Sequence, residues 1–147
     1  MKTTVVIPNY NGIKYLENCM NKLELARKIS DFEILLVDNG SVDGSLELCR
    51  EYEKKGQVKA IYFQENTGFC GAVNAGINAC HTPYVLLLNN DTEVKEDFVL
   101  CMERFMDTHK RAFSASAKML SLHEPDVIDD CGDFRFGSCR CGSLQGT

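Results

Sequence analysis

Three polar residues directly follow an unbroken apolar run in the middle of the chain. Residues 84–88 (YVLLL) carry only apolar and aromatic side chains, and Asn89, Asn90 and Asp91 come next. Carboxylate and amide oxygens are the protein ligands of hard divalent cations, which in turn bind the phosphates of a substrate. These residue types therefore predict a site for a divalent cation and a diphosphate, although Asn and Asp are also common in ordinary turns.

A second polar segment occupies residues 38–45 (DNGSVDGS). A carboxylate such as Asp38 can accept hydrogen bonds from a nucleobase imide or a ribose hydroxyl, and the glycines allow a ligand to approach the backbone closely. The same residues also suit a loop that ends in a helix cap, with Asp43 or Ser45 as the capping residue. Taken alone, this segment leaves both interpretations open.

A third segment, residues 66–76 (NTGFCGAVNAG), is rich in small residues. It is similar to a phosphate-binding glycine loop, but it matches neither the dinucleotide-binding pattern nor the Walker A pattern. By spacing alone, its small residues favour close packing of a helix on a sheet over the binding of a phosphate.

The hydrophobic pattern predicts strands that alternate with helices. Strands are expected at residues 3–8, 32–37, 58–63, 84–88 and 112–119, and helices at 13–29, 46–55, 69–80 and 96–109. The run at 84–88 suits a parallel strand that is buried on both faces, and Asn11 is a candidate cap for the first helix. Because parallel strands end at one edge of their sheet, the polar loops after the first, second and fourth strands should meet there, where such sheets bind ligands.

Composition restricts the class of protein. The chain has 147 residues, of which 44% are hydrophobic and 25% charged, and its net charge is −5. A single domain is the default at this size, and the negative charge argues against a partner that is a nucleic acid. No apolar stretch is long enough for a membrane span or for the core of a signal peptide, so we expect a cytoplasmic protein.

The eight cysteines show no paired metal-binding pattern. Five of them are scattered through the expected helices and are interpreted as small, reduced core residues: Cys19, Cys49, Cys70, Cys80 and Cys101. Cys131, Cys139 and Cys141 cluster near the end, but their spacing is not that of a zinc site.

Four motifs occur in order along the chain: residues 6–12 (VIPNYNG), 37–45 (VDNGSVDGS), 66–69 (NTGF) with 74–76 (NAG), and 88–91 (LNND). Together they resemble the nucleotide-binding half of a family 2 glycosyltransferase and are similar to its rhamnosyltransferase-like branch. The resemblance implies an α/β, Rossmann-like GT-A fold with a mainly parallel sheet flanked by helices. It further implies a nucleotide-sugar-binding domain over residues 1–122 and an irregular tail rich in Gly and Cys over 123–147, where the acceptor-binding half is truncated or very short.

The resemblance also implies roles for particular residues. The nucleotide-binding set is Pro8, Asn9, Tyr10, Asp38, Asn39, Asp43, Asn66, Gly68, Asn74 and Asn90. Asp38 is expected to lie against the base. Asn89 and Asp91 take the place of the family's Asp-x-Asp motif, where Mg²⁺ or Mn²⁺ would be held. Because the first aspartate of that motif is Asn89 here, the formal charge at the metal is lower, and Asp91 is the more direct ligand.

The reaction implied is an inverting transfer of a sugar from a dTDP- or UDP-sugar donor to a glycan or a lipid-linked acceptor. A lipid-linked acceptor would bring the protein to the inner face of the membrane. The catalytic base belongs to the family's later half, and Asp129, Asp130 and Asp133 match no such position. An alternative is a non-catalytic sugar-nucleotide-binding fragment. A nucleotidyltransferase is disfavoured because residues 8–12 contain no basic side chain for a triphosphate.

Overall fold

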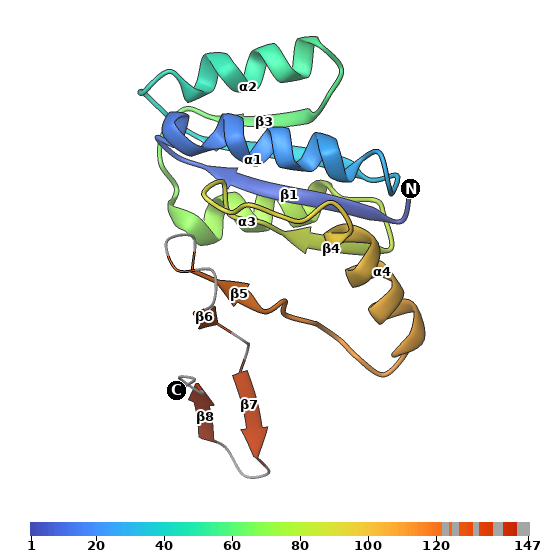
Figure 1. The fold of residues 1–147 in the computed structure, drawn as a ribbon. Coiled ribbons are helices and arrows are strands. Elements are labelled where there is room, and N and C mark those ends of the chain that lie inside the picture. Colours follow the sequence, from blue (N-terminus) through green and yellow to red (C-terminus); the bar gives the residue numbers. More distant parts are fainter. Residues whose placement is uncertain (122–123, 125–126, 131–132, 137–139, 144–147) are drawn as a thin grey trace. The chain divides into compact units, whose positions relative to one another are not determined.

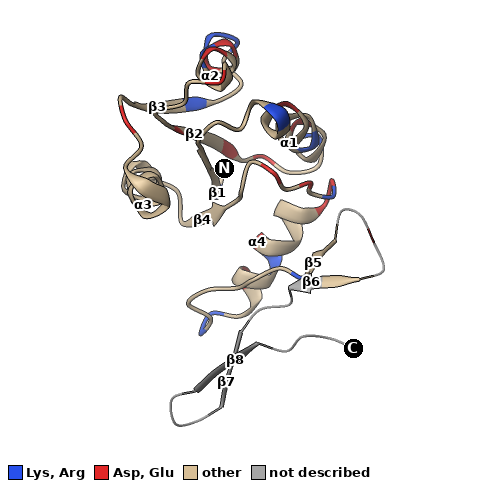
Figure 2. Ribbon diagram, turned by 90° about the vertical axis from the view of Figure 1, so that its left-hand side faces the viewer, with Lys and Arg blue, Asp and Glu red and all other residues tan. Residues whose placement is uncertain are grey.

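Four parallel strands form the sheet that carries the polar loops, in the order β3-β2-β1-β4. Figure 1 labels β3, β1 and β4, and Figure 2 labels all four strands. They are β1 (Thr3–Asn9), β2 (Glu33–Asn39), β3 (Lys59–Phe63) and β4 (Tyr84–Leu87). The structure is a computed structural model, and it describes residues 1–121, 124, 127–130, 133–136 and 140–143. The prediction of a parallel sheet built from alternating strands and helices is confirmed.

Each connection between successive strands of this sheet contains a helix, namely α1 (Ile13–Ala26), α2 (Ser45–Lys54) and α3 (Gly68–Ala79). α1 and α2 cover one face of the sheet, and α3 covers the other (Figure 2). α3 is rich in small residues and contains no charged residue. Its small residues predicted close packing of this helix on the sheet.

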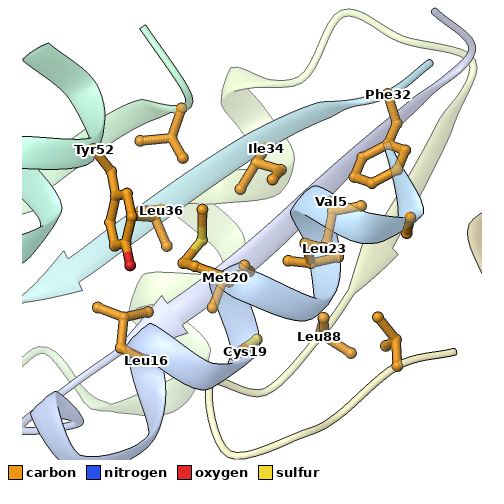
Figure 3. Close-up of a cluster of buried hydrophobic side chains, with 14 of the residues drawn as sticks. Val5, Leu16, Cys19, Met20, Leu23, Phe32, Ile34, Leu36, Tyr52 and Leu88 are labelled. Carbon is orange, nitrogen blue, oxygen red and sulfur yellow. The ribbon is translucent and has the colours of Figure 1, made fainter. Parts of the chain in front are cut away.

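The main core lies between the sheet and α1 (Figure 3). Leu16, Met20 and Leu23 are fully buried at the three- and four-residue spacing of an amphipathic helix. They pack with Val5 of β1, whereas its neighbour Val6 points to the α3 side because successive strand residues face opposite ways. Burial of each such side chain contributes roughly 1.5–3 kcal/mol to folding.

The opposite face is closed by a glycine contact between α3 and the sheet. A Cβ atom on Gly76 would overlap with the Val6 side chain and would lie 3.2 Å from Cγ2 of Val37. Ala72, one turn earlier in α3, is only 1% exposed and packs in the same cluster. The small residues of this helix therefore let its backbone lie directly on β1 and β2.

Strand β4 differs from its prediction. Val85 is 37% exposed and Leu87 49%, so the expected burial of residues 84–88 on both faces is wrong. The physical reason is that β4 is an edge strand, and α3 packs over β1 and β2. Leu88, which follows the strand, is 6% exposed and joins the core on the α1 side.

The chain forms two compact units, Met1–Glu103 and Arg104–Thr147, and the division falls within α4 (Phe98–Thr108). The second unit contains the antiparallel pairs β5 (Met119–Leu120) with β6 (Ile128–Asp130) and β7 (Asp133–Phe136) with β8 (Arg140–Ser143). Among the described residues of 123–147, a segment expected to be irregular, β6, β7 and β8 are short strands. The division of the chain at residue 122 stays a prediction.

The strand expected at residues 112–119 does not form, since only Met119 of that segment lies in a strand. The segment has few large apolar side chains, and Phe113 is completely exposed. Without an apolar face, the segment gains little from packing as a strand. None of the helices in the described ranges has the length and apolar character that a membrane crossing requires.

The five scattered cysteines are free thiols with different environments. Cys19 and Cys49 are buried and Cys80 is half-buried, but Cys70 and Cys101 are exposed, so their assignment to the core is wrong. Both lie at helix positions that face away from the core. The side chains of the three C-terminal cysteines lie outside the described part of the structure.

Candidate functional site

A pocket of about 340 Å³ lies at the carboxyl ends of the strands, within the first compact unit. Its volume is in the range of small-molecule sites. The pocket is lined by Pro8, Asn9, Tyr10, Asn39, Asn66, Gly68, Phe69, Ala72, Asn89, Asn90 and Asp91. The loops that follow β1, β2 and β4 therefore meet at one edge of the sheet, together with the loop that enters α3.

Nine of the twelve residues singled out in the sequence line this pocket, and Asp38, Asp43 and Asn74 do not. Asn74 is an exposed residue of α3. The sequence interpretation missed Phe69 and Ala72. An aromatic residue directly after Gly68 in a glycine-rich segment is the sequence signal that could have identified Phe69, whose side chain is 61% exposed.

Asp38 lies behind the pocket and is completely buried. Its carboxylate accepts hydrogen bonds from Asn9 Nδ2 at 2.9 Å and from the Ser41 backbone N–H at 3.1 Å. Because side chains alternate along β2, Asp38 faces the α1 side, and the next residue, Asn39, faces the pocket. At this strand end the amide, not the carboxylate, is the pocket-lining group.

The Asn39 side chain organises the loop that leads into α3. Its Oδ1 accepts hydrogen bonds from the backbone N–H and the hydroxyl of Thr67, both at 2.9 Å. Its Nδ2 donates to Asn66 Oδ1 at 2.9 Å and to the Gly68 carbonyl at 3.1 Å. Gly68 has a φ of +79°, which is favourable only for glycine. Asn39 therefore holds Asn66 and Gly68 at the wall of the pocket.

Asn89 and Asp91 lie on a turn after β4, in which the Thr92 N–H donates to the Asn89 carbonyl at 3.2 Å. Both side chains are exposed and line the pocket. No group of three or more His, Cys, Asp or Glu side chains that could hold a metal occurs among the described residues. One carboxylate and neighbouring amide oxygens fit a cation such as Mg²⁺ or Mn²⁺ if phosphate oxygens and water complete its coordination.

The thiol of Cys19 lies beneath this turn, where its Sγ is 3.9 Å from the Asn89 carbonyl oxygen that accepts its hydrogen bond. Burial, and to a lesser degree the negative charge of Asp91, raises the pKa of Cys19 to about 12. The thiol of Cys19 therefore stays protonated at neutral pH.

Asp43 connects the N-termini of two helices. Its Oδ2 accepts a hydrogen bond from the Ile13 N–H at the start of α1, at 2.9 Å, and its Oδ1 accepts from the Ser45 N–H at 3.0 Å and from the Ser45 hydroxyl at 2.5 Å. Asn11, the expected cap of α1, instead has a φ of +50° and accepts a hydrogen bond from the Val42 N–H. That expectation is wrong because a carboxylate from a distant loop takes the position.

The pKa of Asp43 reflects these contacts. Desolvation acts to raise it, but hydrogen bonds from the Ser45 hydroxyl and from the Ile13 and Ser45 N–H groups lower it below the ordinary value of 3.8. A carboxyl group with a lowered pKa stabilises the fold above its unfolded-state pKa, and this contribution is lost as the pH falls through the folded-state pKa.

We expect Asp43→Asn to destabilise the fold by about 1 kcal/mol at neutral pH, because the amide keeps only one oxygen to accept from the two helix ends. The difference between variant and wild type should shrink as the pH is lowered below the ordinary carboxyl pKa. Urea denaturation of both proteins over a pH series checks this. A difference that is independent of pH would contradict the role of the ionised carboxylate.

Comparison with known proteins identifies the family. The model of "Glycosyl transferase family 2" matches residues 4–126. Glycosyltransferase GlyA of Streptococcus pneumoniae serotype 4 is 33% identical over 98 residues, which are 67% of this chain and 14% of that protein. An uncharacterized glycosyltransferase of a Nostoc species, alr2836, is 34% identical over 131 residues, which are 88% of this chain and 38% of that protein. The chain thus spans less than half of each of these two relatives.

Solved structures show the same fold. The crystal structure of Staphylococcus aureus TarS 1-349 in complex with UDP-GlcNAc superimposes with a TM-score of 0.64 at 25% identity, over 75% of this chain and 32% of that one. The parallel sheet flanked by helices therefore has GT-A structural neighbours. The motifs at its carboxyl edge lie within residues 4–126, which the family model matches. The chain belongs to glycosyltransferase family 2 and has the GT-A fold.

Proposed function

We propose that this chain is the donor-binding part of an inverting glycosyltransferase that takes its sugar from a nucleoside diphosphate. The observation that carries this proposal is the pocket at the carboxyl edge of β1, β2 and β4. It combines two exposed aromatic rings, Tyr10 at 47% and Phe69 at 61%, with the exposed Asn89 and Asp91. An aromatic surface suits a nucleobase, and oxygen donors suit a diphosphate with its cation.

In this proposal Pro8, Tyr10 and Asn39 lie on the nucleoside side of the pocket, and Asn89 and Asp91 hold Mg²⁺ or Mn²⁺ at the diphosphate. When bound, such a cation would neutralise the charge that develops on the leaving nucleoside diphosphate. The role of this chain is to orient the donor so that an acceptor hydroxyl reaches the anomeric carbon in line. The base that removes the acceptor proton is unassigned.

The donor is proposed to be a UDP- or dTDP-sugar, with transfer of a hexosyl or rhamnosyl group. The resemblance to the rhamnosyltransferase-like branch favours dTDP, and the structural similarity to TarS, whose structure holds UDP-GlcNAc, supports UDP. For the acceptor we propose a glycan or a lipid-linked molecule. A relative named as a poly(ribitol-phosphate) β-N-acetylglucosaminyltransferase supports a polymeric acceptor at 27% identity over 74% of this chain.

Nucleotide binding tests the proposal directly. Thermal unfolding is measured with UDP, dTDP, GDP and ADP, each with Mn²⁺ and each with EDTA. A nucleotide at 100 times its dissociation constant should stabilise the protein by about 2.7 kcal/mol. We expect stabilisation by a pyrimidine diphosphate that requires Mn²⁺. A cooperatively folded protein that responds to none of the four nucleotides would refute the proposal.

A separate assay distinguishes an enzyme from a non-catalytic module. The chain is incubated with UDP- and dTDP-sugars, Mn²⁺ and glycan or lipid-linked acceptors, and the product is identified by mass spectrometry. Transfer to any acceptor would exclude the non-catalytic interpretation. Metal-dependent binding without transfer would instead assign donor binding alone to this chain.

A further inference from the structure

We propose that Asn9 and Asn90, which both line the pocket, are positioning residues that fix the Asn89–Asp91 turn relative to β2, rather than ligands of the cation. The inference rests on the proposed function. It follows from a continuous chain of hydrogen bonds between side chains, Asp38–Asn9–Asn90, which joins the carboxyl ends of β2 and β1 to the turn after β4.

Asn9 is the centre of this chain and is only 1% exposed. Its Nδ2 donates to Asp38 Oδ1 at 2.9 Å, and it also lies 3.0 Å from Ser45 Oγ and 3.2 Å from Ser41 Oγ. Its Oδ1 accepts a hydrogen bond from Asn90 Nδ2 at 2.7 Å. Both ends of the Asn9 amide are therefore engaged with protein groups.

The direction of this chain of hydrogen bonds is set at its buried end, Asp38. An ionised carboxylate only accepts hydrogen bonds, so Asn9 must present its NH₂ group to Asp38. Its carbonyl oxygen must then point to Asn90, and Asn90 must in turn present its own NH₂ group. A reversal of the Asn9 amide would place its oxygen against the buried carboxylate, which is strongly unfavourable.

Close packing at Gly12 holds the same pair in place. A Cβ atom at this position would overlap with both Asn90 Nδ2 and Asn9 Oδ1. Gly12 has a φ of −105°, which any residue can adopt, so steric exclusion by the two amides, not backbone strain, favours glycine here. The backbone at the start of α1 thus closes over the hydrogen bond between Asn9 and Asn90.

Asn90 lies between Asn89 and Asp91 in the sequence, so fixing its side chain restricts the turn that carries both proposed cation ligands. The turn is also held by the hydrogen bond from Cys19 Sγ to the Asn89 carbonyl and, internally, by the hydrogen bond from the Thr92 N–H to the same carbonyl. Loss of the Asn9 contact should therefore displace Asp91 and weaken binding that depends on the cation. The same chain connects the nucleoside side of the pocket, at β2, to its diphosphate side.

Asn90→Asp separates this role from direct coordination, because the two roles predict opposite signs. If Asn90 were a cation ligand, a carboxylate at this position would tighten Mn²⁺-dependent binding of UDP. As a positioning residue it loses its donor and brings an anion against Asn9 Oδ1. We expect the affinity for UDP with Mn²⁺ to fall about tenfold. Isothermal titration calorimetry of UDP at saturating Mn²⁺ measures it.

The matched control is Asn78→Asp, which adds the same charge at an exposed position of α3 outside the pocket. Its affinity should equal that of the wild type. If Asn90→Asp binds UDP with Mn²⁺ as tightly as the control or more tightly, the positioning role is wrong. If the wild type itself binds no nucleoside diphosphate, the proposed function fails first and this inference fails with it.

Exchanging the carboxylate and the amide between positions 38 and 9 tests the chain of hydrogen bonds independently. Asn9→Asp alone places a second carboxylate against Asp38 and should weaken both folding and UDP binding. Adding Asp38→Asn restores a donor opposite the new carboxylate, which can still accept from Asn90. We expect the double variant to recover most of the affinity that the single variant loses. A double variant that binds no better than Asn9→Asp would overturn the proposed direction of the chain.

Discussion

Asp91→Ala is expected to remove most of the stabilisation that we predict a pyrimidine nucleoside diphosphate with Mn²⁺ will confer on the wild-type protein. Asp91 is the only carboxylate among the described residues that line the pocket, so its removal leaves only neutral oxygens for the cation. A hundredfold loss of affinity would reduce a stabilisation of about 2.7 kcal/mol to about 0.4 kcal/mol at the same ligand concentration. Thermal unfolding with UDP or dTDP, with and without Mn²⁺, measures this difference.

Asn89→Asp is the companion variant with the opposite expectation. It supplies the second carboxylate of the Asp-x-Asp pattern and should keep or strengthen the dependence on Mn²⁺. Because Asn89 and Asp91 are both exposed, neither variant should disturb the core, which unfolding without ligand verifies. Equal stabilisation of Asp91→Ala and wild type by the nucleotide with Mn²⁺ would remove Asp91 from the proposed metal site.

Gly76→Val is expected to destabilise the fold by about 3 kcal/mol, because overpacking of a close-packed interface forces side chains or backbone to move. Even the Cβ atom would overlap with Val6, and it would lie 3.2 Å from Cγ2 of Val37. These contacts belong to β1 and β2, so α3 would have to move away from the sheet. Urea denaturation gives the free energy of unfolding.

The control for this prediction is the same substitution two residues later in the helix. Asn78 is exposed, and Asn and Val have similar helix propensities, so Asn78→Val should change stability by less than about 0.5 kcal/mol. A loss in Gly76→Val that is no larger than in the control would show that α3 does not depend on the close contact at Gly76.

The order of the elements and the place of the site could be predicted from the sequence. Apolar runs and helical spacing located the first four strands and the three helices between them to within a few residues. The parallel topology then requires the polar loops to gather at one edge, and the pocket lies there, with Tyr10, Asn39 and Asp91 in its lining. Periodicity and loop composition are local properties, so the sequence carries them directly.

The sequence did not predict which side chains of each element are buried, or which distant residues they contact. The run at 84–88 fits a central strand as well as an edge strand, and only the position of α3 over β1 and β2 leaves Val85 and Leu87 exposed. Likewise, Asp43 was a candidate for a local cap. Its contact with Ile13 joins residues 30 positions apart, and no local pattern encodes that contact.

The end of β2 shows most clearly what the sequence could not predict, namely which polar side chain reaches the pocket. Asp38 and Asn39 are adjacent and polar, and both belong to the expected nucleotide-binding set. The family resemblance implied that the carboxylate of Asp38 lies against the base. Because strand residues alternate between faces, a shift of one position decides which side chain reaches the pocket. The sequence by itself determined the family, the sheet and the edge of the sheet at which the pocket lies. Only the tertiary structure decided that Asn39 lines the pocket while Asp38 is buried with Asn9, since that choice depends on how β2 is oriented between its two layers of helices.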